Sequence, residues 1–206
     1  MKNVIFDIGG VLLNWNTAEI VNSFAQTCSD DEKERRNYAA LLQRDVFGHA
    51  DWLATDAGSL SVADAIKRFA KRTGQPVAEM QRLWDHSGEL LTIKPDTISL
   101  LHELNDRGIS LYCLSNMPME RFNYLRERFD FWPLFRGTVI SGQVKLMKPD
   151  AAIFQHLLEK FDLVAEESIF IDDTLHNAIG AQAVGIRGIH FTDAASCRDQ
   201  LDKLLT

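Results

Sequence analysis

The sequence predicts an α/β fold in which an open, doubly wound parallel sheet carries an inserted α-helical cap. Short apolar runs, typical of buried strands, alternate with amphipathic helical stretches, and this alternation is typical of parallel βαβ units. Residues from about 15 to 90 depart from the pattern, because they contain several helical stretches and almost no β-branched run. We therefore expect an α/β core in residues 1–14 and 90–206 and a helical cap in residues 15–89.

The first strand and the cap come first in the chain. Residues 4–6 form a short apolar strand that stops abruptly at the run Asp7-Ile8-Gly9-Gly10. In the cap, the sequence predicts helices over residues 30–43, 61–73 and 77–86. The second of these begins at Ser61, a residue type that caps helix N-termini, and the third follows a proline.

The later strands and helices alternate regularly. Further strands are predicted over residues 109–114, 138–141, 168–171 and, more weakly, 186–191. Helices are predicted over residues 97–107, 120–128, 151–161, 177–184 and 194–205. The first of these helices has apolar residues at three-residue steps and stops at Gly108, a typical residue of helix C-termini.

Composition limits the partners and the compartment. The chain has 206 residues, of which 46% are apolar and 25% charged, with a formal net charge of −7. This acidic balance argues against a surface for nucleic acid or for an anionic membrane. The three cysteines are widely spaced and form neither a disulfide framework nor a CxxC metal pattern. With no signal-peptide core and no apolar run of about 20 residues, we expect a cytoplasmic protein. The oligomeric state is unknown.

Polar side chains follow four of the five predicted strands. They are Asp7, the pair Ser115-Asn116, Lys148 and the pair Asp172-Asp173. Because the carboxyl ends of parallel strands share one edge of a sheet, we expect these side chains to converge. Three carboxylates in one place favour a hard cation with oxygen ligands, such as Mg²⁺. The hydroxyl, amide and ammonium groups can donate hydrogen bonds to a tetrahedral anion.

These motifs resemble, in order and spacing, the four motifs of the haloacid dehalogenase (HAD) superfamily. Residues 4–12 resemble its first motif, Leu114-Ser115-Asn116 its second, Lys148-Pro149-Asp150 its third and residues 169–173 its fourth. The resemblance covers nearly the whole chain, implies a Rossmann-like core and places the helical insert where a type I cap lies. The chain is most similar to small bacterial sugar-phosphate phosphatases of the α-D-glucose-1-phosphate phosphatase kind.

The resemblance implies a Mg²⁺-dependent phosphatase that acts on a small phosphorylated metabolite, such as a sugar phosphate. Asp7 is then the nucleophile, which forms an aspartyl-phosphate. The implied Mg²⁺ ligands are Asp7, the main-chain carbonyl of Gly9 and Asp173, with Asp172 as a ligand or close partner.

The groups implied to bind phosphate belong to three of the four motifs. They are Ser115, Asn116, the catalytic Lys148 and the N–H groups of Gly9 and Gly10. Residues of the cap or facing it are candidates for substrate contact, namely Trp52, Asp56, Trp84 and Met117.

Position 9 departs from the family pattern. Most HAD phosphatases have a second aspartate there as general acid/base, commonly worth ~10²–10⁴-fold in rate, whereas this chain has Gly9. Either another group such as His176, a cap residue or a bound water supplies the proton, or the leaving group needs little help. Alternatively, the protein is a non-catalytic phosphate-binding regulatory protein. A haloacid dehalogenase or a phosphosugar mutase of the same fold is a further alternative, although dehalogenases use no metal.

Each motif also has a purely structural interpretation. The alternatives are a strand end at Asp7, a helix N-cap at Ser115-Asn116, a solvated loop lysine at Lys148 and a solvated turn at Asp172-Asp173. The presence of all four motifs in order favours the functional interpretation.

Overall fold

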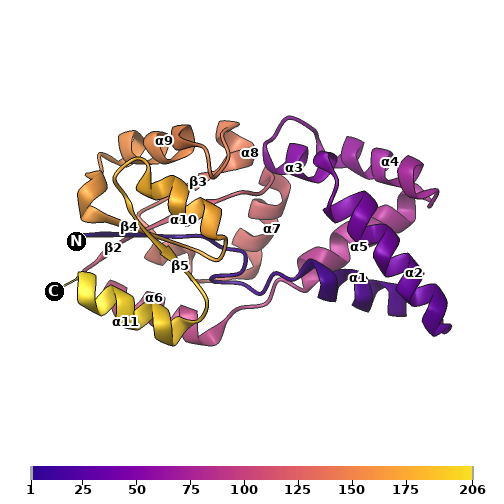
Figure 1. The fold of residues 1–206 in the computed structure, drawn as a ribbon, viewed down its shortest axis with the longest axis horizontal. Coiled ribbons are helices and arrows are strands. Elements are labelled where there is room, and N and C mark those ends of the chain that lie inside the picture. The colour runs from indigo at the N-terminus through magenta and orange to yellow at the C-terminus, as the bar shows by residue number, and fades with distance from the viewer. Residues whose placement is uncertain (1, 206) are drawn as a thin grey trace.

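The computed structural model describes residues 2–205 and contains a five-stranded, all-parallel sheet, which confirms the predicted α/β fold (Figure 1). In chain order the strands are β1 (Asn3–Phe6), β2 (Ser110–Ser115), β3 (Gly137–Ile140), β4 (Ser168–Asp172) and β5 (Arg187–His190). They lie in the order β3-β2-β1-β4-β5, so the strand order reverses between β1 and β4. Phe6 is in register with Cys113 and with Ile171. The residues that follow therefore meet at the reversal point, where open α/β sheets bind ligands.

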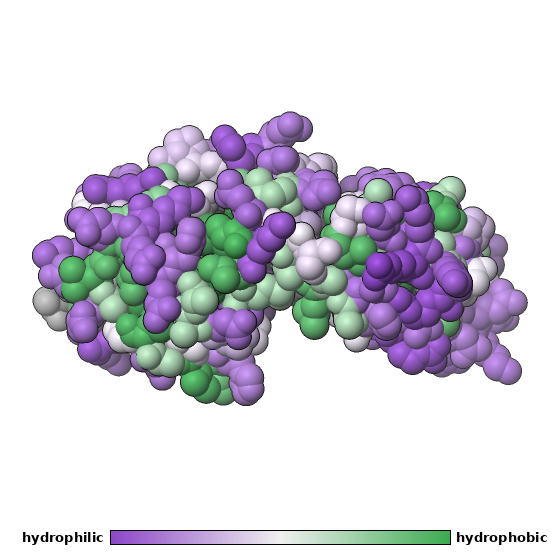
Figure 2. Space-filling view, turned by 90° about the horizontal axis from the view of Figure 1, so that it is seen from above, coloured by the Kyte–Doolittle hydropathy of each residue, from purple (hydrophilic) through white to green (hydrophobic). Residues whose placement is uncertain are grey.

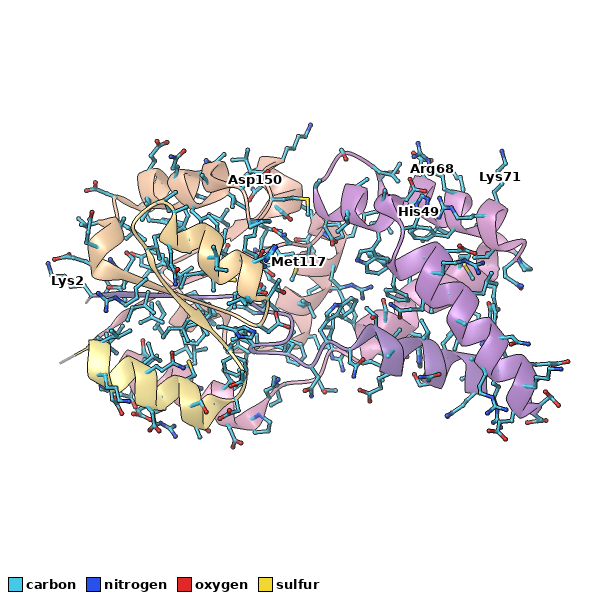
Figure 3. The ribbon with its side chains drawn as sticks, viewed as in Figure 1. Lys2, His49, Arg68, Lys71, Met117 and Asp150 are labelled. Atoms are coloured by element: carbon cyan, nitrogen blue, oxygen red, sulfur yellow. The ribbon has the colours of Figure 1, made fainter. Side chains whose placement is uncertain are left out.

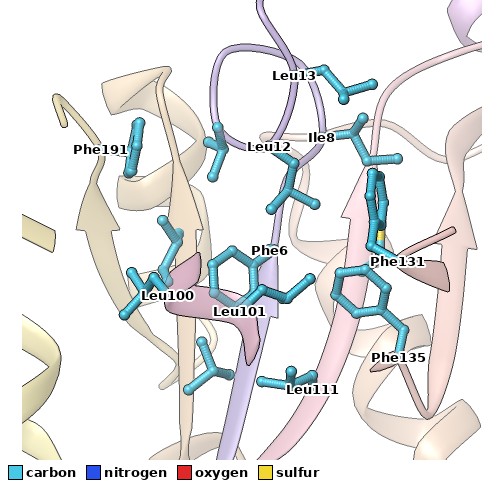
Figure 4. Packing of buried hydrophobic residues seen from close by; sticks show 14 of the residues in the cluster. Phe6, Ile8, Leu12, Leu13, Leu100, Leu101, Leu111, Phe131, Phe135 and Phe191 are labelled. Carbon is cyan, nitrogen blue, oxygen red and sulfur yellow. The ribbon is translucent and has the colours of Figure 1, made fainter. Parts of the chain in front are cut away.

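Helices cover both faces of the sheet, as parallel sheets require. They are α6 (Pro95–Asp106), α7 (Met119–Arg128), α8 (Ser141–Val144), α9 (Ala151–Phe161), α10 (Leu175–Gln182) and α11 (Ala194–Leu204), with the short 3₁₀ helices η2 (Trp132–Leu134) and η3 (Ala165–Glu167). On one face Leu101 of α6 lies in a buried cluster with Phe6 and Phe135 (Figure 4). On the other face the ring of Phe154 in α9 lies 5.3 Å from that of Phe170. The central strands are thus buried on both sides.

Residues 17–89 form a helical body beside the sheet, seen as a second lobe beyond a narrowing in Figures 1 and 2. Its helices are α1 (Thr17–Gln26), α2 (Glu32–Leu42), the π-helix η1 (Gln43–Phe47), α3 (Ala50–Asp56), α4 (Val62–Thr73) and α5 (Val77–Glu89). They bury a hydrophobic cluster of their own, which includes Phe24, Phe69 and Leu83. This cluster supports the division into an α/β core and a helical cap, and the boundaries at residues 14 and 90 stay a prediction. Within residues 2–205, no helix has the length and apolar character needed to cross a membrane.

Two α-helices of this body, α1 and α3, have no counterpart among the predicted elements, and the π-helix η1 extends the predicted helix 30–43. Each begins at a polar cap: Asn16 Oδ1 accepts the N–H of Glu19 at 3.2 Å, and His49 Nδ1 accepts the N–H of Asp51 at 3.0 Å. Helix α3 has only seven residues, too few for an apolar periodicity to stand out. Ser61 caps α4 as predicted, since its side chain accepts an N–H of the first turn at 3.1 Å.

Two linkers connect the helical body to the sheet, and they run side by side. The N–H of Asn14 donates to the carbonyl of Thr92 at 2.8 Å, and its side-chain Nδ2 donates to Thr92 Oγ1 at 2.9 Å. Leu13 and Ile93 form an antiparallel bridge next to this contact. The two linkers therefore form one short paired connection rather than two independent loops.

We expect Leu83→Ala to lower the free energy of unfolding by about 2–5 kcal/mol, because it removes buried methyl groups and leaves a cavity. The matched change Leu53→Ala should shift it by less than about 0.5 kcal/mol. Leu83 is 2% exposed and Leu53 is 57% exposed, and both belong to the helical body. Urea unfolding followed by circular dichroism measures both changes. Equal losses would contradict the buried cluster described for this body.

Candidate active site

The structure brings most of the predicted site residues together at the carboxyl edge of the sheet. Asp7 follows β1, Ser115 ends β2, Asp172 ends β4 and Lys148 lies in the loop before α9. A cavity of about 220 Å³ lies between this edge and the helical body. The predicted site residues that line it are Asp7, Gly9, Ser115, Asn116, Lys148 and Asp173. Asp172 and Gly10 do not line the cavity.

A buried ammonium group joins three strand ends. The side chain of Lys148 is 1% exposed, and its Nζ lies 2.9 Å from Asp7 Oδ1 and 2.6 Å from Asp172 Oδ2. Nζ also donates to the main-chain carbonyl of Leu114 at 3.1 Å. Burial alone would lower the pKa of Lys148, but the two carboxylates outweigh burial and raise that pKa above its ordinary value. Lys148 is therefore a charged group at neutral pH, compensated on two sides.

Asp7 uses one of its two carboxylate oxygens to hold its position. Ser115 Oγ donates to Asp7 Oδ1 at 2.6 Å, and Lys148 contacts the same oxygen. Within residues 2–205 no group donates to Oδ2, so this oxygen is available to a ligand in the cavity. Burial raises the pKa of Asp7 to about 6, while Lys148 opposes the rise and the charge of Asp172 adds to it.

Asp172 and Asp173 are adjacent in the chain but use their oxygens differently. Asp172 Oδ1 accepts the N–H of Thr174 at 2.8 Å and the amide of Asn177 at 3.0 Å. Its Oδ2 accepts from Lys148 at 2.6 Å and again from Asn177 at 3.1 Å. Asp173 lines the cavity, and no other residue in the described part of the chain donates to its carboxylate. Asp172 therefore holds Lys148 and the turn in place, whereas Asp173 offers free oxygens.

The carboxylates lie close enough to share a cation. Asp7, Asp172 and Asp173 each offer an oxygen, and these oxygens lie within 4.8 Å of one another. The main-chain carbonyl of Gly9, a residue that lines the cavity, accepts no hydrogen bond within residues 2–205. Carboxylate and carbonyl oxygens are the ligands that Mg²⁺ prefers. Since the oxygens of Asp172 are already engaged, Asp7, Gly9 and Asp173 fit a cation best.

Position 10 requires a glycine because the carboxylate of Asp173 lies against its Cα. Its φ is +75°, and a Cβ at this position would lie 2.1 Å from Asp173 Oδ2. The N–H of Gly10, predicted to bind phosphate, already donates to the carbonyl of Leu13 at 2.8 Å. Its carbonyl accepts from Lys94 Nζ at 2.9 Å. Sequence reasoning missed Lys94, because a lone lysine between the cap and the next helix belongs to no motif.

Asn116 positions Lys148 through the main chain. Asn116 Oδ1 accepts the N–H of Lys148 at 3.0 Å, and Nδ2 donates to the carbonyl of Lys148 at 3.0 Å. Both the oxygen and the nitrogen of the Asn116 amide therefore hydrogen-bond to the loop that carries Lys148. The contact of Asn116 with phosphate stays a prediction. His176, considered as a proton donor, is exposed and does not line the cavity.

The side of the cavity that faces the helical body is largely aromatic. Its lining includes the four predicted substrate-contact residues Trp52, Asp56, Trp84 and Met117, together with Trp15, Leu91 and Arg121. The ring centre of Trp52 lies 5.4 Å from that of Trp84 and 6.0 Å from that of Trp15. Figure 3 shows Met117 where the sheet faces the helical body. A ligand here meets indole rings on one side and charged groups on the other.

Arg121 is a buried residue of this cavity that sequence reasoning missed. From α7 its Nη2 donates to the carbonyl of Trp84 and to Ser87 Oγ, both at 2.8 Å, and its guanidinium lies 4.3 Å from the ring centre of Trp84. A charged residue on an amphipathic helix normally faces solvent. Its burial here depends on contact between the two lobes, which no local pattern in the sequence reports.

Comparisons with known proteins bear on the family and the fold of this chain. Residues 1–185 match the family model described as haloacid dehalogenase-like hydrolase. The chain is 32% identical over 199 residues to the sesquiterpene phosphatase astK of Aspergillus oryzae, a match that covers 96% of this chain and 94% of that protein. It is 26% identical over 192 residues to a phosphorylated carbohydrates phosphatase of Thermotoga maritima, covering 92% and 84% of the two chains. In fold it resembles a HAD family enzyme of Bacteroides thetaiotaomicron in complex with magnesium and inorganic phosphate, with a TM-score of 0.70, 24% identity and coverage of 90% and 91%.

We expect Gly10→Ala to lower the free energy of unfolding by at least about 1 kcal/mol, because a left-handed backbone disfavours a side chain and the new Cβ meets Asp173. The neighbouring change Gly9→Ala should leave stability unchanged or raise it slightly, since the φ of Gly9 is not positive and the nearest atom to its Cβ, on Trp15, is 3.6 Å away. Urea unfolding of both variants measures the difference. A Gly10→Ala protein as stable as Gly9→Ala would contradict the requirement for a glycine beside Asp173.

Proposed function

Because the chain belongs to the haloacid dehalogenase-like hydrolase family, we propose that it is a Mg²⁺-dependent phosphatase acting on a small phosphorylated metabolite. The observation that carries this proposal is the buried contact of Lys148 with Asp7 and Asp172, next to the free carboxylate of Asp173. This cluster supplies an oxygen nucleophile, a positive charge and cation ligands around one cavity. Both relatives described above carry names of phosphatases, which supports the same reaction class.

In the proposed reaction, Asp7 Oδ2 attacks the phosphorus of the substrate. A bond forms between Asp7 and phosphorus, the ester P–O bond breaks, and its electron pair leaves with the ester oxygen, which takes up a proton. Water then attacks the aspartyl-phosphate, which releases inorganic phosphate and restores the carboxylate. Ser115 and Lys148 orient the nucleophile through Oδ1. To hold the phosphoryl oxygens of a bound substrate, each would turn the donor that it now gives to Asp7 toward the phosphoryl group. Mg²⁺ held by Asp7, the Gly9 carbonyl and Asp173 would neutralise charge as the two anions approach.

The acidic cluster favours this reaction over the alternatives of the same fold. A dehalogenase uses no metal and has no need of free carboxylate oxygens such as those of Asp173 beside its nucleophile. In a protein that only binds phosphate, the carboxylate of Asp7 would repel the ligand, because like charges placed together cost free energy. A phosphosugar mutase shares the chemistry of Asp7 but returns the phosphoryl group to a sugar, so release of inorganic phosphate distinguishes the two.

We expect Asp7→Asn to lower the hydrolysis of 4-nitrophenyl phosphate by at least about 10³-fold, because the amide keeps the size of the side chain but is not an anionic nucleophile. Phosphate release by the unchanged protein should stop on addition of EDTA and return with Mg²⁺. The control Asp199→Asn alters an exposed carboxylate on α11 and should leave the rate unchanged. Activity above a few per cent in Asp7→Asn would exclude covalent catalysis through Asp7, and activity insensitive to EDTA would exclude the cation.

The cavity also bears on the organic part of the substrate. Its walls on the side of the helical body are mainly apolar, and among the described residues this side offers Asp56 and Arg121 as ionisable groups and indole N–H groups as further donors. Arg121 already donates to Trp84 and Ser87. Buried hydroxyl groups need hydrogen-bond partners, so this lining favours a short apolar or aromatic group over a sugar ring. A sugar phosphate stays the second candidate, because indole faces also pack against the apolar faces of sugar rings and one relative is named for phosphorylated carbohydrates.

Hexyl phosphate and glucose 6-phosphate provide a matched comparison, because both are esters of six-carbon primary alcohols. We expect kcat/KM for hexyl phosphate to exceed that for glucose 6-phosphate by about 10-fold or more, since burying hydroxyl groups without partners costs about 1–3 kcal/mol each. Phosphate release at several substrate concentrations measures both values. A higher value for glucose 6-phosphate, or for glucose 1-phosphate added to the series, would establish the sugar phosphate as the better substrate class.

A further inference from the structure

Because position 9 is a glycine, the sheet side of the cavity lacks the aspartate that would give a proton to the ester oxygen as it leaves. Five ionisable side chains line the cavity within the described chain, namely Asp7, Asp56, Arg121, Lys148 and Asp173. In the proposed function, Asp7 is the nucleophile, Asp173 binds the cation and Lys148 is held between carboxylates. Arg121 is bonded to Trp84 and Ser87. Asp56 is the remaining group with a proton to exchange.

Asp56 is anchored to the core although it belongs to the helical body. It is the last residue of α3, and its main-chain carbonyl accepts a hydrogen bond from Ser141 Oγ, at the start of α8. The same Oγ accepts the N–H of Met117 at 2.9 Å, two residues after Ser115. Close packing continues beyond Asp56, because a Cβ on Gly58 would lie 2.3 Å from the carbonyl of Gly142. The backbone of Asp56 is therefore fixed relative to the loop that carries Ser115.

The surroundings of Asp56 favour its protonated form. Within residues 2–205 its carboxyl group forms no hydrogen bond or ion pair, and it shares the cavity wall with indole rings. It also lies in the last turn of α3, where the helix dipole disfavours negative charge. Burial raises the pKa of Asp56 to about 8, and the charge of Arg121 opposes this rise. At neutral pH the group is therefore mainly a carboxylic acid, the form that a proton donor requires.

We propose that Asp56 is the proton donor of this phosphatase, an inference that rests on the proposed function. As the ester P–O bond breaks, its electron pair goes to the ester oxygen, which takes the proton of the Asp56 carboxyl group and leaves as an alcohol. In the second step the attacking water bonds to phosphorus and returns a proton to the Asp56 carboxylate. The aspartate that most HAD phosphatases have at position 9 is thus replaced in function by Asp56, the last residue of the seven-residue helix α3 on the other side of the cavity.

The test compares Asp56→Asn with the unchanged protein on two esters. Hexyl phosphate has a poor leaving group that needs a proton, whereas 4-nitrophenyl phosphate has a good one. The measure is kcat/KM, because it reports the steps up to alcohol release and is independent of the later hydrolysis of the aspartyl-phosphate. We expect the loss for hexyl phosphate to exceed the loss for 4-nitrophenyl phosphate by about 10²-fold. Asp30→Asn, at an exposed carboxylate of the helical body, should change neither value.

Each outcome distinguishes this proposal from the proposed function. Equal losses on the two esters, or no loss on either, would overturn the role of Asp56 and leave the phosphatase assignment intact. If the unchanged protein hydrolyses neither ester, both proposals fail. Circular dichroism and thermal unfolding check that Asp56→Asn folds. Should Asp56→Asn not fold, Asp56→Glu is used instead, because it keeps an acid at this position. We expect its ratio of the two kcat/KM values to stay within about 10-fold of the original ratio. A shift of that ratio by about 10²-fold would count against the proposal.

Discussion

The contact of Lys148 with Asp7 and Asp172 is the interaction on which the rest of the site depends. An ammonium group taken out of water without partners costs several kcal/mol, so Lys148 can be buried only while β1 and β4 both end in carboxylates beside it. Parallel pairing of Phe6 with Ile171 places those two strand ends level with each other. The register of the sheet, the charge balance around Lys148 and the orientation of Asp7 are therefore fixed together. A change that shifts β4 along β1 would separate Asp172 from Lys148 and leave a buried charge without its partner.

The two lobes contribute different chemistry to the cavity. The sheet edge supplies the charged groups, which are mutually bonded and leave little freedom for substitution. The helical body supplies indole rings, which contact a ligand through area rather than through fixed hydrogen bonds. In the proposed function, the nucleophile and the cation ligands come from the sheet edge, whereas the helical body contributes apolar contacts to the organic group and the proposed proton donor Asp56. Relatives of the same fold can therefore share the reaction while their substrates differ.

The sheet and its edge residues could be predicted because their positions follow from the order of the elements alone. Parallel strands end at one edge, so Asp7, Ser115 and Asp172 converge whatever the loops between them do. Lys148 lies in a loop, and its place at this edge follows from its motif and not from a strand end. The different roles of Asp172 and Asp173 could not be predicted, since adjacent side chains at a strand end face opposite sides and either could have faced the cavity. Arg121 depends on contacts between residues far apart in the sequence. The same is true of Trp15, which lies in a linker with no periodicity to interpret.

The hydrogen bond from Ser141 to the carbonyl of Asp56 also bears on the timing of the reaction. Helix α3 meets α8 on one side of the gap between the lobes, and the paired linkers cross on the other side (Figure 1). A rotation of the helical body about those linkers would widen the cavity and break this hydrogen bond in the same movement. Asp7 and Lys148 would then stay assembled on the sheet while Asp56 withdrew. Substrate would then enter a site that lacks the proposed proton donor. Asp56 would reach the substrate only when the lobes closed and excluded bulk water.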